Sequence, residues 1–189
     1  MVALVSFGAM AQDSKAYLAL NVGASFPGGD VADNLELGTG FDLNLNFGYR
    51  FTESIGATLT YGAAASTFEE TGTLDAGDTA AFINQYFGLG PMYTVVLGDN
   101  LSWDIKPQYL FSLSAQENYE EVDMDVKDIS GSGWLLGQSL VFGLDTGLKF
   151  SINLDYMTGK YTNVPDQSLI TKDDSYSSFV LGVGMRYNF

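Results

Sequence analysis

Cysteine and histidine are both absent from this chain of 189 residues, and each absence excludes a class of chemistry. Without cysteine the chain can form no disulfide, no thiolate metal site and no thiol nucleophile. Without histidine it lacks the usual general base near neutral pH and the commonest zinc ligand. We therefore expect no enzymatic activity, no cofactor and no metal site.

Basic residues are scarce as well, since eight Lys and Arg accompany 23 Asp and Glu and give a net charge of −15. Nucleic-acid binding depends on Lys and Arg that neutralise phosphates, so we set a nucleic-acid partner aside. The sequence has no apolar run of the roughly 18 residues that a membrane-spanning helix needs, which excludes a helical span. The length suits a single domain.

Glycine and aromatic residues are abundant, with 22 Gly, 13 Phe and 11 Tyr beside only 4 Pro, and this composition favours an all-β fold. The clearest segment is FDLNLNFGYRF at 41–51, where Phe, Leu and Tyr fill the odd positions. The even positions hold Asp42, Asn44, Asn46, Gly48 and Arg50. Such alternation is typical of a strand whose two faces meet different environments.

Seven further segments alternate in a similar way, so the sequence predicts eight strands. They are 17–25, 55–63, 83–95, 101–113, 133–144, 148–157 and 177–189. Within 101–113 we assign Leu113 to the apolar face and Ser112 to the polar face. Segment 133–144 has aliphatic residues on both faces, and its apolar face is assigned to Trp134, Leu136, Leu140 and Phe142.

The predicted connections alternate in length along the chain. Short turns are expected at 52–54, 98–100 and 145–147, and long polar loops at about 26–40, 65–80, 115–131 and 160–175. This order predicts an up-and-down antiparallel sheet with all long loops at one end and both chain termini at the other.

Two closed eight-stranded barrels fit this plan, and they differ in which face is apolar. A soluble lipocalin-like barrel points apolar residues at a ligand cavity, whereas a transmembrane barrel points them at lipid. The polar face here is rich in Gly, Ser, Thr and Asn, which suit the narrow interior of a small barrel. The segments also match the roughly 9–11 residues of a membrane strand, and aromatic residues cluster near their ends. We therefore favour an eight-stranded antiparallel transmembrane β-barrel.

The polar face carries a nearly balanced set of charges, as a low-dielectric interior requires. Four basic residues share it with Asp42, Asp104 and Asp155. We expect Asp104, together with Glu53, to bridge among the bases in a network inside the barrel. The members of this predicted lumen charge network are Arg50, Asp104, Lys106, Lys149 and Arg186.

The two ends of the chain have distinct patterns. A short apolar run precedes Ala9-Met10-Ala11, which fits a signal-peptide cleavage pattern without its basic n-region. We expect residues 1–11 to be a signal-peptide remnant and residues 12–189 to form the barrel. At the other end Val183, Met185, Tyr187 and Phe189 alternate with small or polar residues.

This ending and the eight alternating segments resemble the small eight-stranded outer-membrane β-barrel family of Gram-negative bacteria, the OmpA/OmpX-like barrels. The resemblance implies that Val183, Met185, Tyr187 and Phe189 form a C-terminal insertion signal recognised by the barrel-assembly machinery. It also implies a bacterial outer-membrane location, contact with lipid and lipopolysaccharide, and periplasmic termini. Enzymes of this fold rely on histidine, which this chain lacks.

We expect a non-enzymatic structural or surface-interaction role in which four acidic loops are displayed outside the cell, with an unknown surface partner. A narrow porin-like channel and a soluble lipocalin-like ligand-binding barrel remain as alternatives. Asp123, Asp125 and Asp128 are spaced as a hard cation would require, but the calcium-loop glycine and distal Glu are missing. Solvated acidic loops explain them better, as they do the pairs Glu69–Glu70 and Glu120–Glu121.

Overall fold

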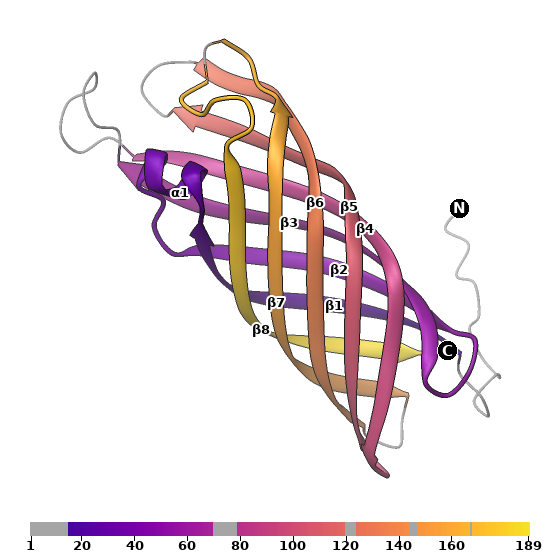
Figure 1. Ribbon diagram of the computed structural model, residues 1–189. Helices are drawn as coiled ribbons and strands as arrows, with labels where there is room; N and C mark the ends of the chain where they lie inside the picture. Colours follow the sequence, from indigo (N-terminus) through magenta and orange to yellow (C-terminus); the bar gives the residue numbers. More distant parts are fainter. Residues whose placement is uncertain (1–14, 70–78, 120–123, 144–146, 167) are drawn as a thin grey trace, which may run out of the picture.

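A computed structural model describes residues 15–69, 79–119, 124–143, 147–166 and 168–189, and eight antiparallel strands in it close into one barrel (Figure 1). The predicted all-β, eight-stranded antiparallel barrel is therefore confirmed. The strands are β1 (Ala16–Gly28), β2 (Gly40–Arg50), β3 (Ile55–Glu69), β4 (Thr79–Gly98), β5 (Leu101–Tyr119), β6 (Met124–Gly143), β7 (Leu148–Asn163) and β8 (Ser175–Asn188).

The barrel closes where β1 pairs with β8. Val22 lies opposite Val183 in this ladder. At its lower end in Figure 1, the backbone N–H of Ala16 donates to the carbonyl oxygen of Phe189 at 3.2 Å, and the N–H of Phe189 donates back at 2.9 Å. The first and last strands are thus joined up to residue 189. We call this the short-turn end, because the connections 51–54 and 99–100, the end of β6 at Gly143 and the start of β7 at Leu148 also lie there.

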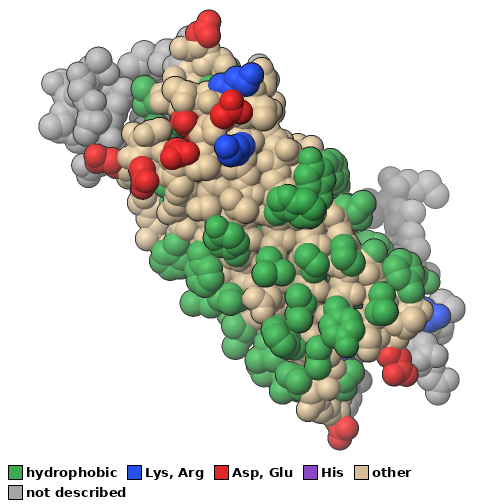
Figure 2. All heavy atoms as spheres, viewed as in Figure 1, with side chains coloured by type: hydrophobic (Ala, Val, Ile, Leu, Met, Phe, Trp, Pro, Cys, Tyr) green, Lys and Arg blue, Asp and Glu red, His purple; other side chains and the backbone are tan. Residues whose placement is uncertain are grey.

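The half of the barrel next to the short turns, here the short-turn half, has its apolar side chains outside. Leu45 is 45% exposed, whereas its neighbour Asn46 is 2% exposed and lies inside. The alternation of outward and inward side chains holds in all eight strands, and Figure 2 shows the apolar side chains gathered over this half. A few apolar residues also lie inside, namely Tyr17, Ala19, Met92 and Val141. This orientation is opposite to that of a lipocalin-like barrel and fits lipid outside.

Two rings of aromatic side chains bound this apolar surface. Near the middle of the barrel, ring centroids lie 4.9 Å apart for Phe87 and Phe111 and 5.2 Å apart for Tyr109 and Trp134. At the short-turn end Tyr187 stacks on Phe189 at 6.3 Å. Aromatic residues at both borders of an apolar band are typical of the two interfaces of a membrane.

The strands continue well beyond the upper aromatic ring, and two of the four predicted long loops are too long, whereas those at about 26–40 and 160–175 agree with the strand ends. The loop expected at 65–80 shrinks because β3 runs through Glu69 and β4 starts at Thr79, while the loop expected at 115–131 shrinks because β5 runs through Tyr119 and β6 starts at Met124. In these extensions, here the loop half, apolar residues such as Ile129 lie inside, and polar ones such as Thr67 and Ser130 lie outside. The prediction depends on apolar residues that face outward, and strands with polar outward faces do not match that pattern.

A β-bulge in β5 corrects a second prediction. The pairing register of β5 with β6 shifts between Leu110 and Leu113, and both Phe111 and Ser112 point outward. The extra residue turns Leu113 into the interior, where it is fully buried. A bulge inverts the side-chain alternation of the strand beyond it, so Leu113 and Ser112 exchange their predicted faces.

The connection between β1 and β2 contains one short helix, α1 (Asp30–Leu35), which the sequence analysis did not predict. Gly29 precedes it with φ of 84°, a conformation that favours glycine. Val31 and Leu35 of α1 are buried, so the helix packs its apolar side onto the loop end of the barrel. No helix in the described ranges has the length and apolar character to cross a membrane.

Candidate functional site in the barrel interior

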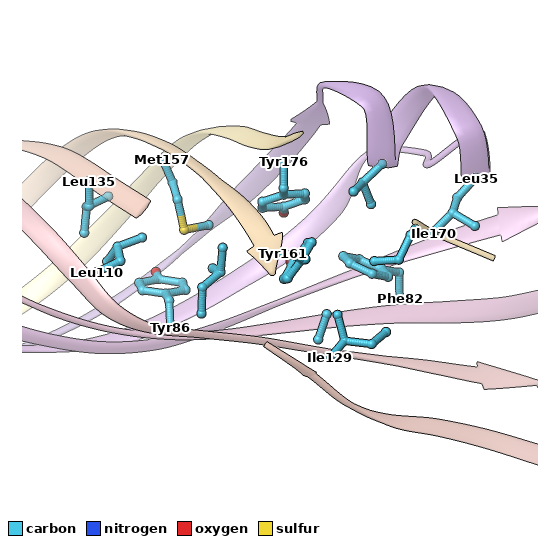
Figure 3. Close-up of a cluster of buried hydrophobic side chains, with 13 residues drawn as sticks. Leu35, Phe82, Tyr86, Leu110, Ile129, Leu135, Met157, Tyr161, Ile170 and Tyr176 are labelled. Atoms are coloured by element: carbon cyan, nitrogen blue, oxygen red, sulfur yellow. The ribbon is translucent and has the colours of Figure 1, made fainter. Parts of the chain in front are cut away.

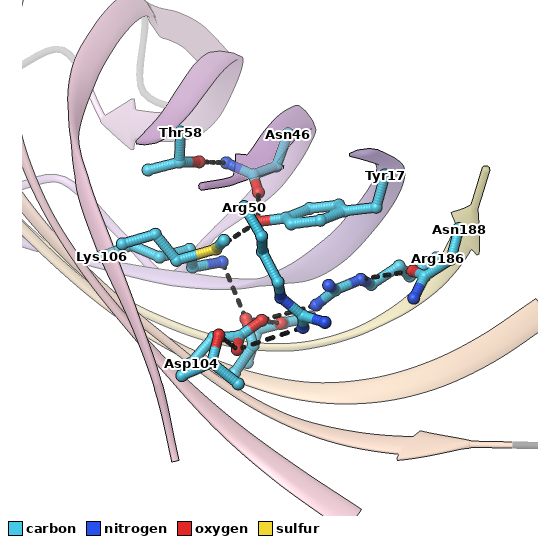
Figure 4. Close-up of polar contacts among 12 residues, drawn as sticks. Tyr17, Asn46, Arg50, Thr58, Asp104, Lys106, Arg186 and Asn188 are labelled. Atoms are coloured by element: carbon cyan, nitrogen blue, oxygen red, sulfur yellow. Dashed lines mark hydrogen bonds and ion pairs between the residues drawn. The ribbon is translucent and has the colours of Figure 1, made fainter. Parts of the chain in front are cut away.

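Asp104 is the centre of a charged cluster inside the short-turn half (Figure 4). Its carboxylate accepts a hydrogen bond from Thr94 Oγ1 at 2.6 Å and forms an ion pair with the guanidinium of Arg186. Arg50 Nη2 lies 3.9 Å from Asp104 Oδ1, the oxygen that also accepts from Thr94, whereas Arg186 contacts Oδ2. Asp104 and Arg186 are both buried, so each compensates a charge that would be costly alone.

Arg186 is held by two further contacts. Its Nε donates to the Asn188 side chain at 2.9 Å, and its guanidinium carbon lies 3.5 Å from the centre of the Tyr17 ring. Tyr17 in turn donates its hydroxyl to Asn46 at 2.7 Å. The cation–π contact and the hydrogen bonds fix Arg186 across the width of the interior.

The structure brings together only part of the predicted lumen charge network. Arg50, Asp104 and Arg186 meet, whereas the Lys106 ammonium donates to Ser139 at 2.8 Å. Lys149 is the cross-strand neighbour of Arg186, so two like charges adjoin there. Glu53, expected to bridge as well, is exposed in the turn after β2.

A chain of hydrogen bonds leads from Lys106 across the barrel toward its middle. Each member is buried or nearly so, and adjacent members lie 2.7–3.0 Å apart. The chain runs through Ser139, Asn153, Asn21, Asn44, Asp42 and Tyr86. These contacts explain why the even positions of 41–51 are polar, because the side-chain amides of Asn44 and Asn46 both have partners inside the barrel.

Little space remains among these side chains. The void between Tyr17, Asp104, Lys106 and Arg186 has a volume of about 10 Å³. A cavity needs roughly this volume to hold a single water molecule. The charged cluster therefore fills the cross-section at this level.

The interior of the loop half is an apolar core, which the sequence analysis missed (Figure 3). Phe82, Tyr161 and Tyr176 form a triangle of rings with centroids 5.9–6.4 Å apart. Around it pack Val31, Leu35, Tyr86, Leu110, Leu113, Ala115, Ile129, Leu135, Met157 and Ile170. The sequence signal of this core is the second aliphatic face of 133–144, which includes the buried Leu135.

The segment between β7 and β8 closes the mouth above this core. Ile170 inserts into the core and is 2% exposed. The buried carboxylate of Glu117 accepts hydrogen bonds from Ser168 Oγ at 2.6 Å and from the Leu169 N–H at 3.2 Å. These contacts anchor the segment on both sides of Leu169.

A second contact fixes α1 to the start of β8. Ser175 donates to Asp30 Oδ2 through its hydroxyl at 2.7 Å and through its backbone N–H at 3.0 Å. These two hydrogen bonds, the hydroxyl above all, lower the pKa of the Asp30 carboxyl from its usual value. The negative form of Asp30 is thus the one that holds the helix.

The remaining predicted residues do not form a reactive site in the described part. Val183, Met185 and Tyr187 face outward from β8, and Phe189 is partly buried beside Ala16. No group of three or more acidic side chains that could hold a metal occurs among the described residues. The side chains of Asp123, Asp125 and Asp128, the Glu69–Glu70 and Glu120–Glu121 pairs and residues 1–11 lie outside the description.

A closed antiparallel wall with an apolar belt outside and paired polar groups inside defines a transmembrane β-barrel. A family model described as an outer membrane protein beta-barrel domain matches residues 1–189, and the chain belongs to this family. Solved structures similar to this chain in fold include bacterial outer-membrane barrels. No curated protein sequence gave a significant match.

Three solved structures illustrate the likeness. Neisserial surface protein A (NspA) has a TM-score of 0.63 at 13% identity, covering 93% of this chain and 98% of its own. Ail of Yersinia pestis has a TM-score of 0.54 at 15% identity, covering 91% and 97%. The N-terminal barrel domain of Pseudomonas aeruginosa OprF has a TM-score of 0.53 at 12% identity, covering 94% and 100%. At these identities the likeness concerns the fold.

Proposed function

We propose that the protein is a non-enzymatic outer-membrane anchor that presents a folded surface at its loop end to a partner outside the cell. In this proposal the short-turn end and both chain termini face the periplasm. Residues 1–11 are removed on export, and Val183, Met185, Tyr187 and Phe189 are recognised by the assembly machinery. Lipid and lipopolysaccharide surround the apolar belt.

The observation that carries this proposal is an interior filled at two levels. The Asp104 cluster occupies the short-turn half with a void of only about 10 Å³, and the apolar core with Ile170 occupies the loop half. An ion would have to displace a buried ion pair and then cross an apolar layer, and each step is costly. A filled barrel fits an anchor better than a pore.

The loop end suits a partner with positive charge. Exposed acids there outnumber the two bases Lys160 and Lys172, as Figure 2 also shows. The described exposed acids are Asp30, Asp33, Glu36, Asp166 and Asp173. Charges of one sign on a surface steer oppositely charged partners and repel like-charged ones.

The proposal is tested by single-channel recording of the purified chain in planar bilayers. We expect no steady conductance from the unmodified protein. The double variant Asp104→Ala with Ile170→Ala, which loosens both levels, is the positive control for a leak. A stable open channel of the unmodified protein would overturn the anchor and favour the narrow porin-like channel.

A further inference from the structure

Two of the four prolines of the chain lie opposite each other in the barrel wall. The paired residues Leu89↔Tyr109 and Tyr93↔Ile105 share one register, which places Pro91 of β4 opposite Pro107 of β5. Residues 90–92 and 106–108 lack ladder partners across this seam, although both strands are described throughout the region. We call this interruption the proline seam.

The backbone of Pro91 points toward β5. On the other side of β4, the N–H of Thr94 donates to the carbonyl of Ser54 at 2.8 Å, so Thr94 faces β3. Successive residues of a strand direct their N–H and C=O groups to alternate sides. Pro91, an odd number of residues away, therefore faces β5.

Pro107 points back toward β4 by the same reasoning. The N–H of Gly143 donates to the carbonyl of Asn100 at 2.7 Å, so Asn100 faces β6, and the β5–β6 register is constant from Leu101 through Leu110. Pro107 is an odd number of residues away and therefore faces β4. The two prolines thus occupy a hydrogen-bonding position of the ladder where neither can donate.

The seam leaves a long stretch of wall without cross-strand hydrogen bonds. The bonded pairs that flank it are four residues apart, which corresponds to about 13 Å along the strands. Pro91 and Pro107 are exposed on the apolar belt, between Tyr93 and Tyr109. Missing backbone partners are costly in lipid, because no water is available to replace them.

At the end nearer the short turns, the inner side of the seam is covered by the buried side chains of Met92 from β4 and Lys106 from β5. Toward the loop end, Gly88 and Gly90 give β4 no inward side chain. Gln108 of β5 lies behind the seam; it is 2% exposed, and its Oε1 has no hydrogen-bond partner. That oxygen is close enough to Gly88 that a Cβ there would lie 3.2 Å away.

We propose that the proline seam is a lateral entry and binding site for a membrane-dissolved molecule with a slender apolar body and a hydrogen-bond donor, such as a long-chain alcohol. Separating the strands here breaks no bond between the flanking pairs. The three acceptors at the seam, the carbonyls of Pro91 and Pro107 and the Gln108 amide oxygen, call for a donor. The apolar body would reach Leu110 in the apolar core. This role is additional to surface presentation.

The test uses the full chain in lipid nanodiscs and a long-chain alcohol with a diazirine in its tail. After illumination, mass spectrometry should find adducts on inward residues Tyr86 and Leu110. The double variant Pro91→Val with Pro107→Val restores both N–H donors, and labelling of those residues should fall about tenfold because two hydrogen bonds then close the seam. Pro27→Val, in β1 near the mouth, is the matched control and should label normally.

A second variant distinguishes the hydrogen bond from the alcohol hydroxyl to Gln108 from the opening of the proline seam. Gln108→Leu should reduce interior labelling by the alcohol but not by a diazirine alkane of equal length. Equal interior labelling of the unmodified chain and the double valine variant, or adducts confined to outward residues, would overturn the proposal. If the double variant fails to assemble, Pro107→Val alone gives the same comparison. Conductance is read separately, so failure here leaves the anchor proposal standing.

Discussion

Along β7 the two halves of the barrel show opposite patterns. Near the short turns Ser151 and Asn153 lie inside, whereas Ile152 and Leu154 lie outside. Past Tyr156 the order reverses, and Met157 and Tyr161 lie inside with Lys160 and Thr162 outside. A single strand therefore carries both a membrane pattern and a water-exposed pattern.

This difference indicates that the medium around each half, lipid or water, determines which kind of side chain can stabilise its interior. In the short-turn half, apolar side chains on the outward face contact lipid, so no apolar core is needed inside. The polar groups of the interior are paired by ion pairs and hydrogen bonds around Asp104. In water the outward face must be polar, and stability comes from apolar burial around Phe82. The two interiors should therefore respond differently to substitution.

The largest effect is expected from Asp104→Ala, which leaves Arg186 buried without its carboxylate. Breaking a buried pair in this way costs about 3–5 kcal/mol. Urea unfolding in detergent or the temperature of heat modification on a gel measures the loss. Asp99→Ala, at an exposed turn position of the same end, is the control and should be neutral. Equal stability of the two variants would mean that the charged cluster around Asp104 does not stabilise the barrel.

Ile170→Ala tests the apolar core from the loop side. Removing this buried side chain should cost about 2–5 kcal/mol and loosen the segment over the mouth. Limited proteolysis between β7 and β8 should become faster. The neighbouring Leu169 is 50% exposed, so Leu169→Ala is a matched control. Similar cleavage of both variants would mean that Ile170 does not hold the mouth closed.

Leu45→Arg places a charge on the lipid face of the short-turn half. We expect a loss of about 2–4 kcal/mol near the middle of the bilayer, measured by unfolding from lipid vesicles. Thr162→Arg makes the same kind of change on the outward face of the loop half, where water is expected, and should be tolerated. A comparable penalty at both positions would contradict the division of the barrel.

The smallest effect concerns pH at the contact between Asp30 and Ser175. Because hydrogen bonds lower the pKa of Asp30 in the folded chain, this contact is fully present above the usual carboxyl range and is lost as pH falls through the lowered pKa. Ser175→Ala should move the Asp30 pKa upward, as an NMR titration would show. An unchanged pKa in that variant would rule out Ser175 as the cause.

The class of fold was predictable because eight strands repeat one pattern. Alternation places Leu45 and Asn46 on opposite faces whatever the turn geometry, and the structure confirms these faces. Asp104 could be expected among the interior bases, since a buried carboxylate needs a cation. That Asp104 pairs with Arg50 and Arg186 and not with Lys106 depends on the pairing register of several strands, which cannot be read from the sequence.

The loop half was not predictable by the same rule. Its strands alternate in the opposite sense, and the bulge at Phe111 and Ser112 shifts β5 by one position. The pattern of outward apolar residues therefore ends near the upper aromatic ring. Seeing that the pattern reverses requires knowing where the membrane ends, which is a property of the assembled barrel.

The most direct test of the two-half barrel is a spin-label scan of the outward positions of β7 in lipid bilayers. Labels at 150, 152, 154 and 156 should be accessible to oxygen and protected from a water-soluble nickel reagent. Labels at 160 and 162 should show the reverse, with the change between 156 and 160. Lipid-type accessibility continuing through 162 would contradict the account, as would water-type accessibility at 152.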